Sequence, residues 1–453
     1  MNNLQNLLKS QFENKKVLLV GLGLLGGGVG LAKFFAQLGA KVRVTDKKTK
    51  EQLLPSIKQL NNLTIHFTLG KHDIKDFLEA DVIFKGPSVP WDLPQLKEAQ
   101  KMGKPIEMES SFFAQYCPAP IIGVTGTRGK STTTYMIYKI LKNIGLSCYL
   151  AGNIPGISTI NLLLKIRPTD WVVMELSSWQ LAGFHQKKIS PHVAVFTSFS
   201  PDHLNLYSSM SHYFYDKKAI YLYQKDKDCL IINKELKSEV EKDQIRAQIH
   251  YVSTQNLPFR LDFLKGEHNL KNATCAYEVA KILNLDLKKA ADIITGFTGL
   301  PYRQEVIVVK DGIVFVNDTT STTPTACVAA INSFSDFPII LILGGNSKNL
   351  SYDVLINRLI DTEKIILLKG SFTDQIFSRL QKKYSKKITP VFNDFQKAVK
   401  TAYQYAKKIL LERKIGKVVL LLSPGATSFS MFSNEFHRGD EFNKIVKKMT
   451  KSS

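Results

Sequence analysis

The stretch GVTGTRGKSTTT, residues 123–134, constrains the fold more than any other part of the chain. It follows the apolar segment IIGV and leads into STTTYMIYKILKNIG, whose apolar residues recur at helical spacing. In such an arrangement of strand, glycine loop and helix, backbone N–H groups and Lys130 can hold phosphates, and Ser131 can reach a magnesium ion. Val124 stands where a strict P-loop has glycine. The stretch therefore predicts a phosphate site in a parallel α/β domain, with a looser loop than the strict motif.

The same alternation of short apolar strands and amphipathic helices runs through the chain in three blocks. At 453 residues the chain is too long for one core, so we expect three α/β domains. We place them at residues 1–117, 118–300 and 301–453, with the Pro-rich segment YCPAP at 116–120 as the first linker.

Charge and apolar content exclude several classes of protein. The chain carries 61 Lys and Arg against 39 Asp and Glu, a net charge of +22, but its lysines are spread over amphipathic segments without a dense basic block. This pattern favours solvated helix faces over a nucleic-acid surface. Five cysteines without metal-like spacing suit a reducing cytoplasm, and the longest apolar runs are too short for membrane insertion. We expect a cytoplasmic protein that attracts anionic substrates.

The first block contains a second glycine loop. Gly21, Gly23 and Gly26 fit G-x-G-x-x-G after the strand KVLLV, and Asp46 ends the next strand twenty residues after Gly26. Glycines there permit close backbone approach to a ligand, and the following helix directs its N-terminus at an anion. Any Rossmann-like domain can carry this turn, with or without NAD. On these residues alone, an NAD-dependent dehydrogenase is an alternative.

In the second block, several side chains that could bind a metal or take part in catalysis occur at or after the ends of strands, or in a nearby helix. Glu175 ends the apolar strand in DWVVMELSSWQL, where it could bind magnesium or simply begin the next helix. Beside Lys130 the magnesium interpretation is favoured. His203 follows the strand HVAVFTSF, although an isolated histidine is more often structural. Lys217 and Lys218 lie in an otherwise apolar and aromatic helix, and on this evidence two solvated lysines are the simpler interpretation.

The third block repeats strands that end in loops of small residues: IVFVNDTTSTTPTA, IILILGGNSKN and VVLLLSPGATSFSMF. Loops at the carboxyl ends of strands in open α/β sheets are where ligands bind. Asp318, Thr322, Lys348 and Ser428 are therefore candidates as a group, although each alone is a routine turn residue.

Taken together, these pieces resemble the Mur ligase family over essentially the whole chain. The pieces that carry the resemblance are GVTGTRGKSTTT, AGNIPG, MELSSWQL, PDHLNLY, HNLKNA, GLPYRQE, NDTTSTTPTA, LILGGNSKN and LLSPGATSFSMF. The family's own loop lacks strict P-loop spacing, which accounts for Val124. The resemblance implies an N-terminal Rossmann-like domain for a UDP-linked substrate, a central P-loop-type ATPase domain with a parallel sheet, and a C-terminal Rossmann-like domain for an amino acid.

The resemblance also implies the chemistry. Within the family, ELSSWQL and LSPGATS…RGDEF point to the glutamate-adding member. We expect ATP-dependent joining of D-glutamate to UDP-N-acetylmuramoyl-L-alanine through an acyl phosphate, in cytoplasmic peptidoglycan precursor synthesis. The expected cofactors are two magnesium ions and CO2, the latter as a lysine carbamate. We expect a monomer whose partners are these small molecules, with neither nucleic acid nor a membrane.

Roles for individual residues follow from the same resemblance. Catalytic roles fall to Lys130, His203 and Lys217. Lys217 matches the carbamylated lysine, with Lys218 as the alternative. The metal ligands are Ser131, Glu175, His203 and Lys217. ATP-side positions are Gly126, Thr127, Gly129, Lys130, Ser131, Thr132, Asn272, Arg303 and Asp318. UDP-side positions are Leu24, Leu25, Asp46, Lys47, Asn153 and Ser177, and the positions for the amino acid are Thr322, Lys348 and Ser428.

Two departures from the family pattern concern the added amino acid. Thr320 stands where many members have lysine, and Glu435 stands where we expect an aromatic residue, with Phe436 one position later. A variant that adds L-glutamate is therefore the nearest alternative within the family. Outside it, the alternatives are the dehydrogenase and a non-catalytic nucleotide-binding regulator. The regulator need not keep Glu175, His203 and Lys217 together.

Overall fold

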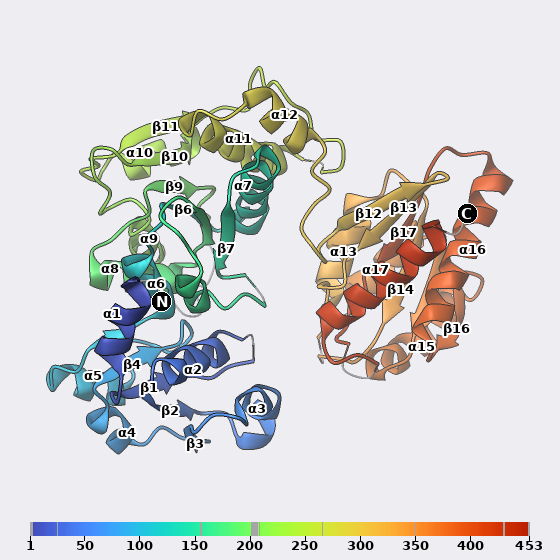
Figure 1. The fold of residues 1–453 in the computed structure, drawn as a ribbon. Coiled ribbons are helices and arrows are strands. Elements are labelled where there is room, and N and C mark those ends of the chain that lie inside the picture. Colours follow the sequence, from blue (N-terminus) through green and yellow to red (C-terminus); the bar gives the residue numbers. More distant parts are fainter. Residues whose placement is uncertain are drawn as a thin grey trace. The chain divides into compact units, whose positions relative to one another are not determined.

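The computed structural model describes residues 3–24, 26–154, 156–200, 207, 209–264, 266–348, 350–428 and 431–451. By its contacts the chain divides into two compact units. One comprises residues 1–260 with 266–295, and the other comprises residues 261–265 with 296–453 (Figure 1). Within the described ranges, no helix combines the length and the apolar character needed to cross a bilayer.

The first sheet, in the first unit, has five parallel strands in the order β3-β2-β1-β4-β5. Its strands are β1 (Lys16–Val20), β2 (Lys41–Asp46), β3 (His66–Leu69), β4 (Val82–Lys85) and β5 (Ile106–Glu107). The helices of this region are α1 (Asn3–Phe12), α2 (Gly27–Gln37), α3 (Lys50–Ile57), η1 (Lys58–Leu60), α4 (Ile74–Glu79), α5 (Pro94–Lys101) and α6 (Glu109–Tyr116). The expected strand KVLLV and the end of the second strand at Asp46 are confirmed.

Both faces of this sheet are buried. Val17 and Leu19 belong to one apolar cluster with residues of α1 and α2, whereas Leu18 and Val20 belong to another with residues of α4 and α5. Successive side chains of a strand point to opposite faces, so β1 contributes to both clusters. Helices on both faces of a parallel sheet are the Rossmann-like arrangement that the sequence predicts.

The second sheet, also in the first unit, has six parallel strands in the order β11-β10-β9-β6-β8-β7. Its strands are β6 (Ile121–Thr125), β7 (Cys148–Gly152), β8 (Trp171–Glu175), β9 (Val193–Phe196), β10 (Cys229–Asn233) and β11 (Gln248–Val252). Its helices are α7 (Lys130–Ile144), η2 (Ile160–Leu164), α8 (Ser178–Lys187), α9 (Met210–Lys218), η3 (Lys234–Leu236), α10 (Lys237–Val240), α11 (Glu267–Ile282) and α12 (Leu287–Thr295).

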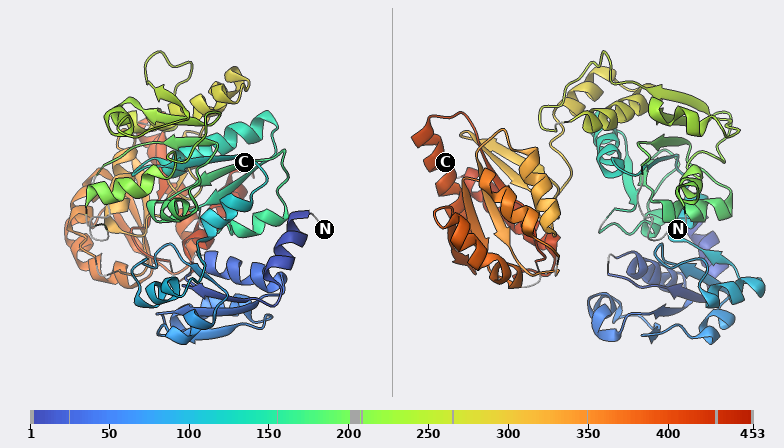
Figure 2. Two further views of the ribbon diagram at one scale, coloured as in Figure 1. Left: turned by 90° about the vertical axis from the view of Figure 1, so that its left-hand side faces the viewer. Right: turned by 180° about the vertical axis from the view of Figure 1, so that it is seen from behind.

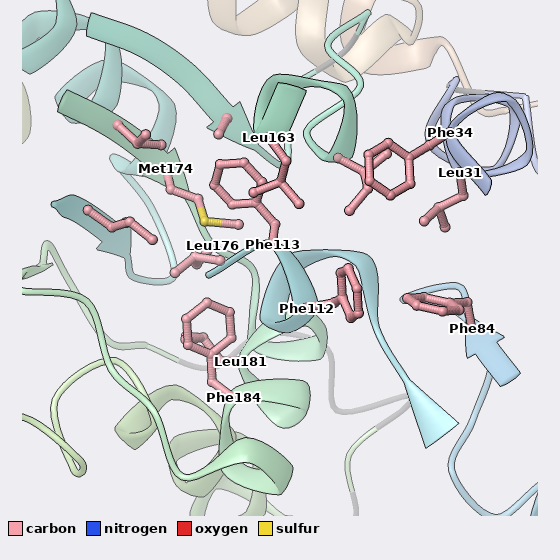
Figure 3. Close-up of a cluster of buried hydrophobic side chains, with 14 of the residues drawn as sticks. Leu31, Phe34, Phe84, Phe112, Phe113, Leu163, Met174, Leu176, Leu181 and Phe184 are labelled. Carbon is pink, nitrogen blue, oxygen red and sulfur yellow. The ribbon is translucent and has the colours of Figure 1, made fainter. Parts of the chain in front are cut away.

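One apolar cluster contains residues from the regions of both these sheets. Phe112 of α6 packs edge-on against Phe84 of β4, with ring centroids 5.2 Å apart. Its neighbour Phe113 lies beside Leu163 and Met174, and Leu181 and Phe184 of α8 lie close by (Figure 3). Burying a large apolar side chain contributes about 1.5–3 kcal/mol, so α6 holds the two sheet regions together in one unit.

The third sheet forms the second unit and has the order β12-β13-β17-β14-β15-β16, with only β12 and β13 antiparallel among the described pairs. Its strands are β12 (Glu305–Lys310), β13 (Ile313–Asn317), β14 (Ile339–Gly344), β15 (Lys364–Leu368), β16 (Ile388–Phe392) and β17 (Val418–Leu422). Its helices are α13 (Pro324–Ser333), α14 (Asp353–Arg358), η4 (Leu359–Asp361), α15 (Ser371–Tyr384), α16 (Phe395–Arg413) and α17 (Glu435–Lys451).

This sheet is also covered on both faces. Leu341 and Leu343 of β14 pack with residues of α13, α14 and α15, whereas Ile340 and Ile342 pack with residues of α16 and α17. The right-hand view in Figure 2 shows helices on either side of these strands. The α/β architecture expected for all three blocks is therefore confirmed.

Candidate active site

The glycine loop of the second sheet connects β6, which ends at Thr125, to α7, which begins at Lys130. The Lys130 ammonium donates hydrogen bonds to the Gly126 oxygen at 3.0 Å and to the Thr127 oxygen at 3.1 Å. Ser131 and Thr132 follow in the first turn of α7, where backbone N–H groups have no partner in the helix itself. The loop thus combines a cation with a helix N-terminus, an arrangement suited to phosphate.

Two glycines permit the close packing of this loop. Gly129 has φ 84°, and a Cβ there would lie 2.1 Å from Oδ1 of Asn272, which is buried in α11. Gly126 has φ 150°, and a Cβ there would lie 2.1 Å from Oγ1 of Thr197 after β9. The Thr127 N–H also donates to the Ser198 oxygen at 2.7 Å. The loop therefore requires glycine at both positions and is braced by a neighbouring strand and by α11.

The two lysines of α9 have different surroundings. The Lys217 ammonium is buried, donates to the Gly126 oxygen at 2.9 Å and lies 4.8 Å from the ring centroid of Tyr213. Lys218 instead donates to Asp243 at 2.7 Å, away from the loop. Of these two residues, the structure brings Lys217 to the phosphate loop.

Glu175 ends β8 beside the loop, since Val124 of β6 pairs with Glu175 in register. Its side chain is buried and accepts a hydrogen bond from Nδ2 of Asn153 at 3.1 Å. Ser177 is the N-cap of α8 and accepts from the Gln180 N–H. Asn153, Glu175 and Ser177 therefore lie together at the carboxyl ends of β7 and β8.

The residues around Glu175 suit a magnesium ion. Within the described ranges Glu175 has no ion-pair partner, and a buried carboxylate requires compensation by a cation or several donors. Mg²⁺ typically binds one or two protein carboxylates and completes its shell with waters and substrate phosphates. Nowhere among the described residues, Glu175 included, do three or more His, Cys, Asp or Glu residues form a group that could hold a metal ion. His203 and Leu25 lie outside the described residues.

The run of hydroxyl residues after Lys130 includes two side chains that sequence reasoning did not single out. The hydroxyls of Thr133 and Thr134 are buried and have no hydrogen-bond partner among the described residues. The run of three threonines in the motif could have drawn attention to these two residues. Only their burial in the structure distinguishes them from Ser131 and Thr132.

The Asp46 carboxylate accepts hydrogen bonds from the backbone of the first glycine loop. Its Oδ2 accepts from the N–H groups of Leu22 at 2.9 Å and Gly23 at 3.3 Å, and its Oδ1 accepts from the Lys48 N–H at 2.9 Å. The carboxylate thus fixes the loop backbone, while the side chains of Leu24 and Lys47 are exposed.

Three adjacent strands of the second unit carry the remaining candidates. Because β13, β17 and β14 are parallel neighbours, their carboxyl ends bring the loops of Thr322, Ser428 and Lys348 to one edge of the sheet. The Lys348 ammonium donates to Oγ1 of Thr322 at 2.8 Å. The Ser428 hydroxyl is buried and has no hydrogen-bond partner among the described residues. A buried hydroxyl without a partner and an ammonium at the same edge of the sheet are groups that suit a carboxylate.

The other candidates of this unit surround Asp318. Asp318 is buried and accepts from the Ser423 hydroxyl at 2.7 Å and the Gln304 N–H at 3.1 Å. Burial raises the pKa of its carboxyl to about 6, against the hydrogen bonds and the nearby charge of Arg303. The Thr320 hydroxyl donates to the Tyr302 oxygen at 2.8 Å. Thr320 is therefore hydrogen-bonded to the backbone, and it supplies no positive charge at the position where many family members have lysine.

The aromatic residue that is missing at Glu435 is supplied one position later. Phe436 packs edge-on against the Tyr302 ring, with centroids 5.6 Å apart. Sequence reasoning also passed over Arg438, which is buried beneath the same loops. Its presence in RGDEF was the available signal.

Comparison with known proteins gives full-length matches. Residues 124–262 match the Mur ligase middle domain, and residues 15–107 match the Mur ligase MurD-like N-terminal domain. A UDP-N-acetylmuramoylalanine–D-glutamate ligase of Roseiflexus sp. (strain RS-1) is 34% identical, over 97% of this chain and 100% of that protein. The ligase of the same name from Acetivibrio thermocellus is 33% identical, over 98% of this chain and 99% of that protein.

The chain belongs to the Mur ligase family. A solved UDP-N-acetylmuramate–alanine ligase from Thermotoga maritima agrees in fold, with a TM-score of 0.55 and 17% identity over 97% of this chain and 100% of that chain. Membership in the Mur ligase family explains why a strand, a glycine loop and Lys130 occur together in the middle region. It also removes the reason to interpret the first glycine loop as that of a dehydrogenase.

Proposed function

We propose that this member of the Mur ligase family adds D-glutamate to UDP-N-acetylmuramoyl-L-alanine at the expense of ATP, a step of peptidoglycan precursor synthesis. The observation that carries the proposal is the near full-length similarity to relatives named for this reaction. The phosphate loop, with Lys130 and Lys217 beside it, supports the ATP half of the reaction. Lys348, Thr322 and the unsatisfied Ser428 hydroxyl support an acidic amino acid.

The reaction has two bond-forming steps. An oxygen of the alanine carboxylate bonds to the γ-phosphorus of ATP, and the bond to the β-phosphate oxygen breaks to release ADP. The amine of D-glutamate then attacks the acyl carbon, forming the amide, and phosphate leaves with one former carboxylate oxygen. The amine loses its proton to solvent. Phosphorylation is needed because a carboxylate cannot expel oxide, whereas phosphate is a good leaving group.

Lys130 would neutralise the transferred phosphoryl group. Its ammonium, which now donates to the carbonyls of Gly126 and Thr127, can turn outward by rotation of a flexible side chain. Phosphoryl transfer depends on positioning and charge neutralisation more than on covalent help from the protein. The loop carbonyls hold the cation close to its point of action, so little reorganisation is required.

Magnesium, when bound, neutralises phosphate charge and orients the γ-phosphate for in-line attack. Glu175 and Ser131 would hold one ion, and a second ion would be held by His203 and Lys217. The Lys217 side chain is buried against the loop, and addition of CO2 to its nitrogen would replace the ammonium by an anionic oxygen ligand. Lys218 is disfavoured for this role because its side chain pairs with Asp243, away from the loop.

The UDP-linked substrate would bind the first sheet region at Leu24, Leu25, Asp46 and Lys47, with Asn153 and Ser177 from the second. Asn272, Arg303 and Asp318 would complete the ATP site. We place domain boundaries at residues 1–117, 118–300 and 301–453, and infer a cytoplasmic monomer. The strands of the three sheets fall at 16–107, 121–252 and 305–422, which supports those boundaries.

One assay tests the proposed function. Phosphate release from ATP is measured with and without UDP-N-acetylmuramoyl-L-alanine, and with D-glutamate, L-glutamate, glycine or lysine. We expect release only with the UDP-linked substrate and D-glutamate together. A clear preference for L-glutamate would assign the L-glutamate-adding variant instead. ATP turnover without any acceptor dependence would contradict the ligase assignment.

A further inference from the structure

The three loops around the candidate amino-acid site are joined to one another in pairs. The Lys348 ammonium bonds the Thr322 hydroxyl, which joins the β14 and β13 loops. Asn346 and Thr427 exchange backbone hydrogen bonds of 2.9 and 3.0 Å, which joins the β14 and β17 loops. The remaining pair, the β13 and β17 loops, is joined next to the strands by the hydrogen bond from Ser423 to Asp318. Farther along both loops, one side chain from α17 joins them.

That side chain is Arg438, which is 1% exposed. Its Nε donates to Oγ1 of Thr319 at 2.9 Å, and its Nη2 donates to the Thr319 oxygen at 2.8 Å. Both terminal nitrogens donate to the Ala426 oxygen at 3.3 Å. Thr319 lies three residues before Thr322, and Ala426 lies two residues before Ser428. One planar guanidinium thus donates hydrogen bonds to both of the loops that carry the hydroxyls.

The approach of α17 to these loops is unusually close. A Cβ at Gly439 would lie 2.6 Å from Cγ2 of Thr319 and 2.5 Å from Cδ1 of Tyr302, so only glycine fits there. The Asn317 amide also donates to the Gly439 oxygen at 3.1 Å. These contacts hold the α17 backbone against the β13 loop and leave Arg438 little freedom to move.

Within the described part of the chain, Arg438 forms no hydrogen bond with a carboxylate, although the nearby charges of Glu435 and Asp318 favour its charged form. Among the described residues it forms no ion pair, and all the acceptors of its guanidinium are neutral oxygens of Thr319 and Ala426. A buried cation that is only partly compensated is costly, and neutral donors could hold the loops equally well. A charge kept at that cost beneath an anion site suggests that the anion offsets it.

We propose that Arg438 is a positioning and specificity-determining residue of the amino-acid site, which favours amino acids with an anionic side chain. It holds Thr322 and Ser428 at the spacing that a side-chain carboxylate requires. Its buried charge also adds a positive field behind these hydroxyls, where the low dielectric makes a fixed charge effective. Neutral amino acids benefit from the spacing but not from the field. This inference rests on the proposed ligase function.

The test compares Arg438→Gln, which keeps neutral donors, with Arg438→Lys, which keeps the charge but not the planar fork. For each full-length variant, kcat/KM is measured with D-glutamate and with D-glutamine, which have nearly the same size but differ in side-chain charge and in one hydrogen-bonding group. KM is also measured for ATP and the UDP-linked substrate. Arg413→Met is the matched control, because Arg413 forms an exposed ion pair with Glu363 in the same unit.

For Arg438→Gln we expect the preference for D-glutamate over D-glutamine to fall by at least about tenfold. The lysine variant should keep that preference within about threefold, although its KM for D-glutamate rises. The KM values for ATP and the UDP-linked substrate should change little, and the Arg413→Met variant should match the unaltered enzyme. An equal loss of activity toward both amino acids in the glutamine variant, with the preference intact, would overturn the charge role.

Measurements on a third variant and on the unaltered enzyme distinguish failure of this inference from failure of the proposed function. If the glutamine and lysine variants fail to fold by circular dichroism, Thr319→Val removes one acceptor while keeping the charge. It should raise the KM for D-glutamate about fivefold, with the D-glutamate preference retained. An unchanged KM there would refute the positioning role. Failure of the unaltered enzyme to use any amino acid would refute the proposed function, whereas normal turnover with indifferent variants would refute only the role of Arg438.

Discussion

Two glycine loops in the first unit follow central strands of parallel sheets, yet their surroundings differ. In the loop after β1, the N–H groups of Leu22 and Gly23 donate to the Asp46 carboxylate, and the tip residue Leu24 is exposed and apolar. In the loop after β6, the ammonium groups of Lys130 and Lys217 both donate to the Gly126 oxygen. The backbone of the first loop is therefore bonded to a carboxylate, whereas the backbone of the second loop is bonded to two ammonium groups.

This difference teaches that turn geometry locates a ligand, whereas side chains from other elements decide its charge. Both loops lie where strand order reverses within the sheet, which is where open α/β sheets bind ligands. Only the second concentrates positive charge suited to the γ-phosphate of ATP. Substitutions in each loop should therefore affect different substrates.

The largest expected effect concerns Lys130. Lys130→Ala should lower kcat about a thousandfold, because a positioned charge on the transferred phosphoryl group is lost. Circular dichroism and the melting temperature should remain close to those of the unaltered enzyme, since Lys130 is only partly buried. Near-normal turnover in the folded variant would remove the second loop from phosphoryl transfer, and the contrast between the loops would disappear.

The next effect separates the two lysines of α9. Lys217→Ala should lower kcat about a hundredfold or more, because the proposed carbamate would no longer supply an oxygen ligand to magnesium. Acetate should restore part of the activity, because it offers a similar carboxylate oxygen. Lys218→Ala, which breaks the pair with Asp243, is the matched control and should stay active. Carbon-13 NMR with labelled CO2 should show a carbamate signal that Lys217→Ala lacks. The opposite pattern would transfer the carbamate to Lys218.

A smaller effect is expected in the second unit. Lys348→Ala should raise the KM for D-glutamate about thirtyfold, because a bound carboxylate loses its charged donor. The KM for ATP should barely change, since Lys348 lies outside the phosphate loop. Exposed Lys382 in α15 provides a control lysine from the same unit. Equal changes in both KM values would show that Lys348 acts on the whole fold rather than on the amino acid.

The smallest effect concerns the first loop. Asp46→Ala removes the acceptor of the Leu22, Gly23 and Lys48 N–H groups and should lower the free energy of unfolding by about 1–3 kcal/mol. The KM for the UDP-linked substrate should rise about tenfold, and that for ATP should stay the same. Calorimetry should detect binding of the UDP-linked substrate but not of NAD. A change in the ATP KM alone would contradict the division of roles between the loops.

Local sequence patterns determined much of the fold. The strand β1 matches the apolar run KVLLV, and β8 ends at Glu175 as expected. The helix α7 begins at Lys130, one residue before the expected start. The order of motifs was enough to predict three α/β regions and the Mur ligase family. These features follow from short-range periodicity and from glycines at turns, so they are readable without contacts.

Other features were decided only by tertiary structure. The choice between Lys217 and Lys218 depends on which side of α9 faces the β6 loop, and this follows from packing of the helix on the sheet. The Asp46 carboxylate accepts hydrogen bonds from the Leu22 and Lys48 N–H groups, and the sequence pattern did not indicate these contacts. Arg438 lies 119 residues after Thr319, which accepts two of its hydrogen bonds. Contacts over such separations depend on how whole elements pack, and no local pattern encodes them.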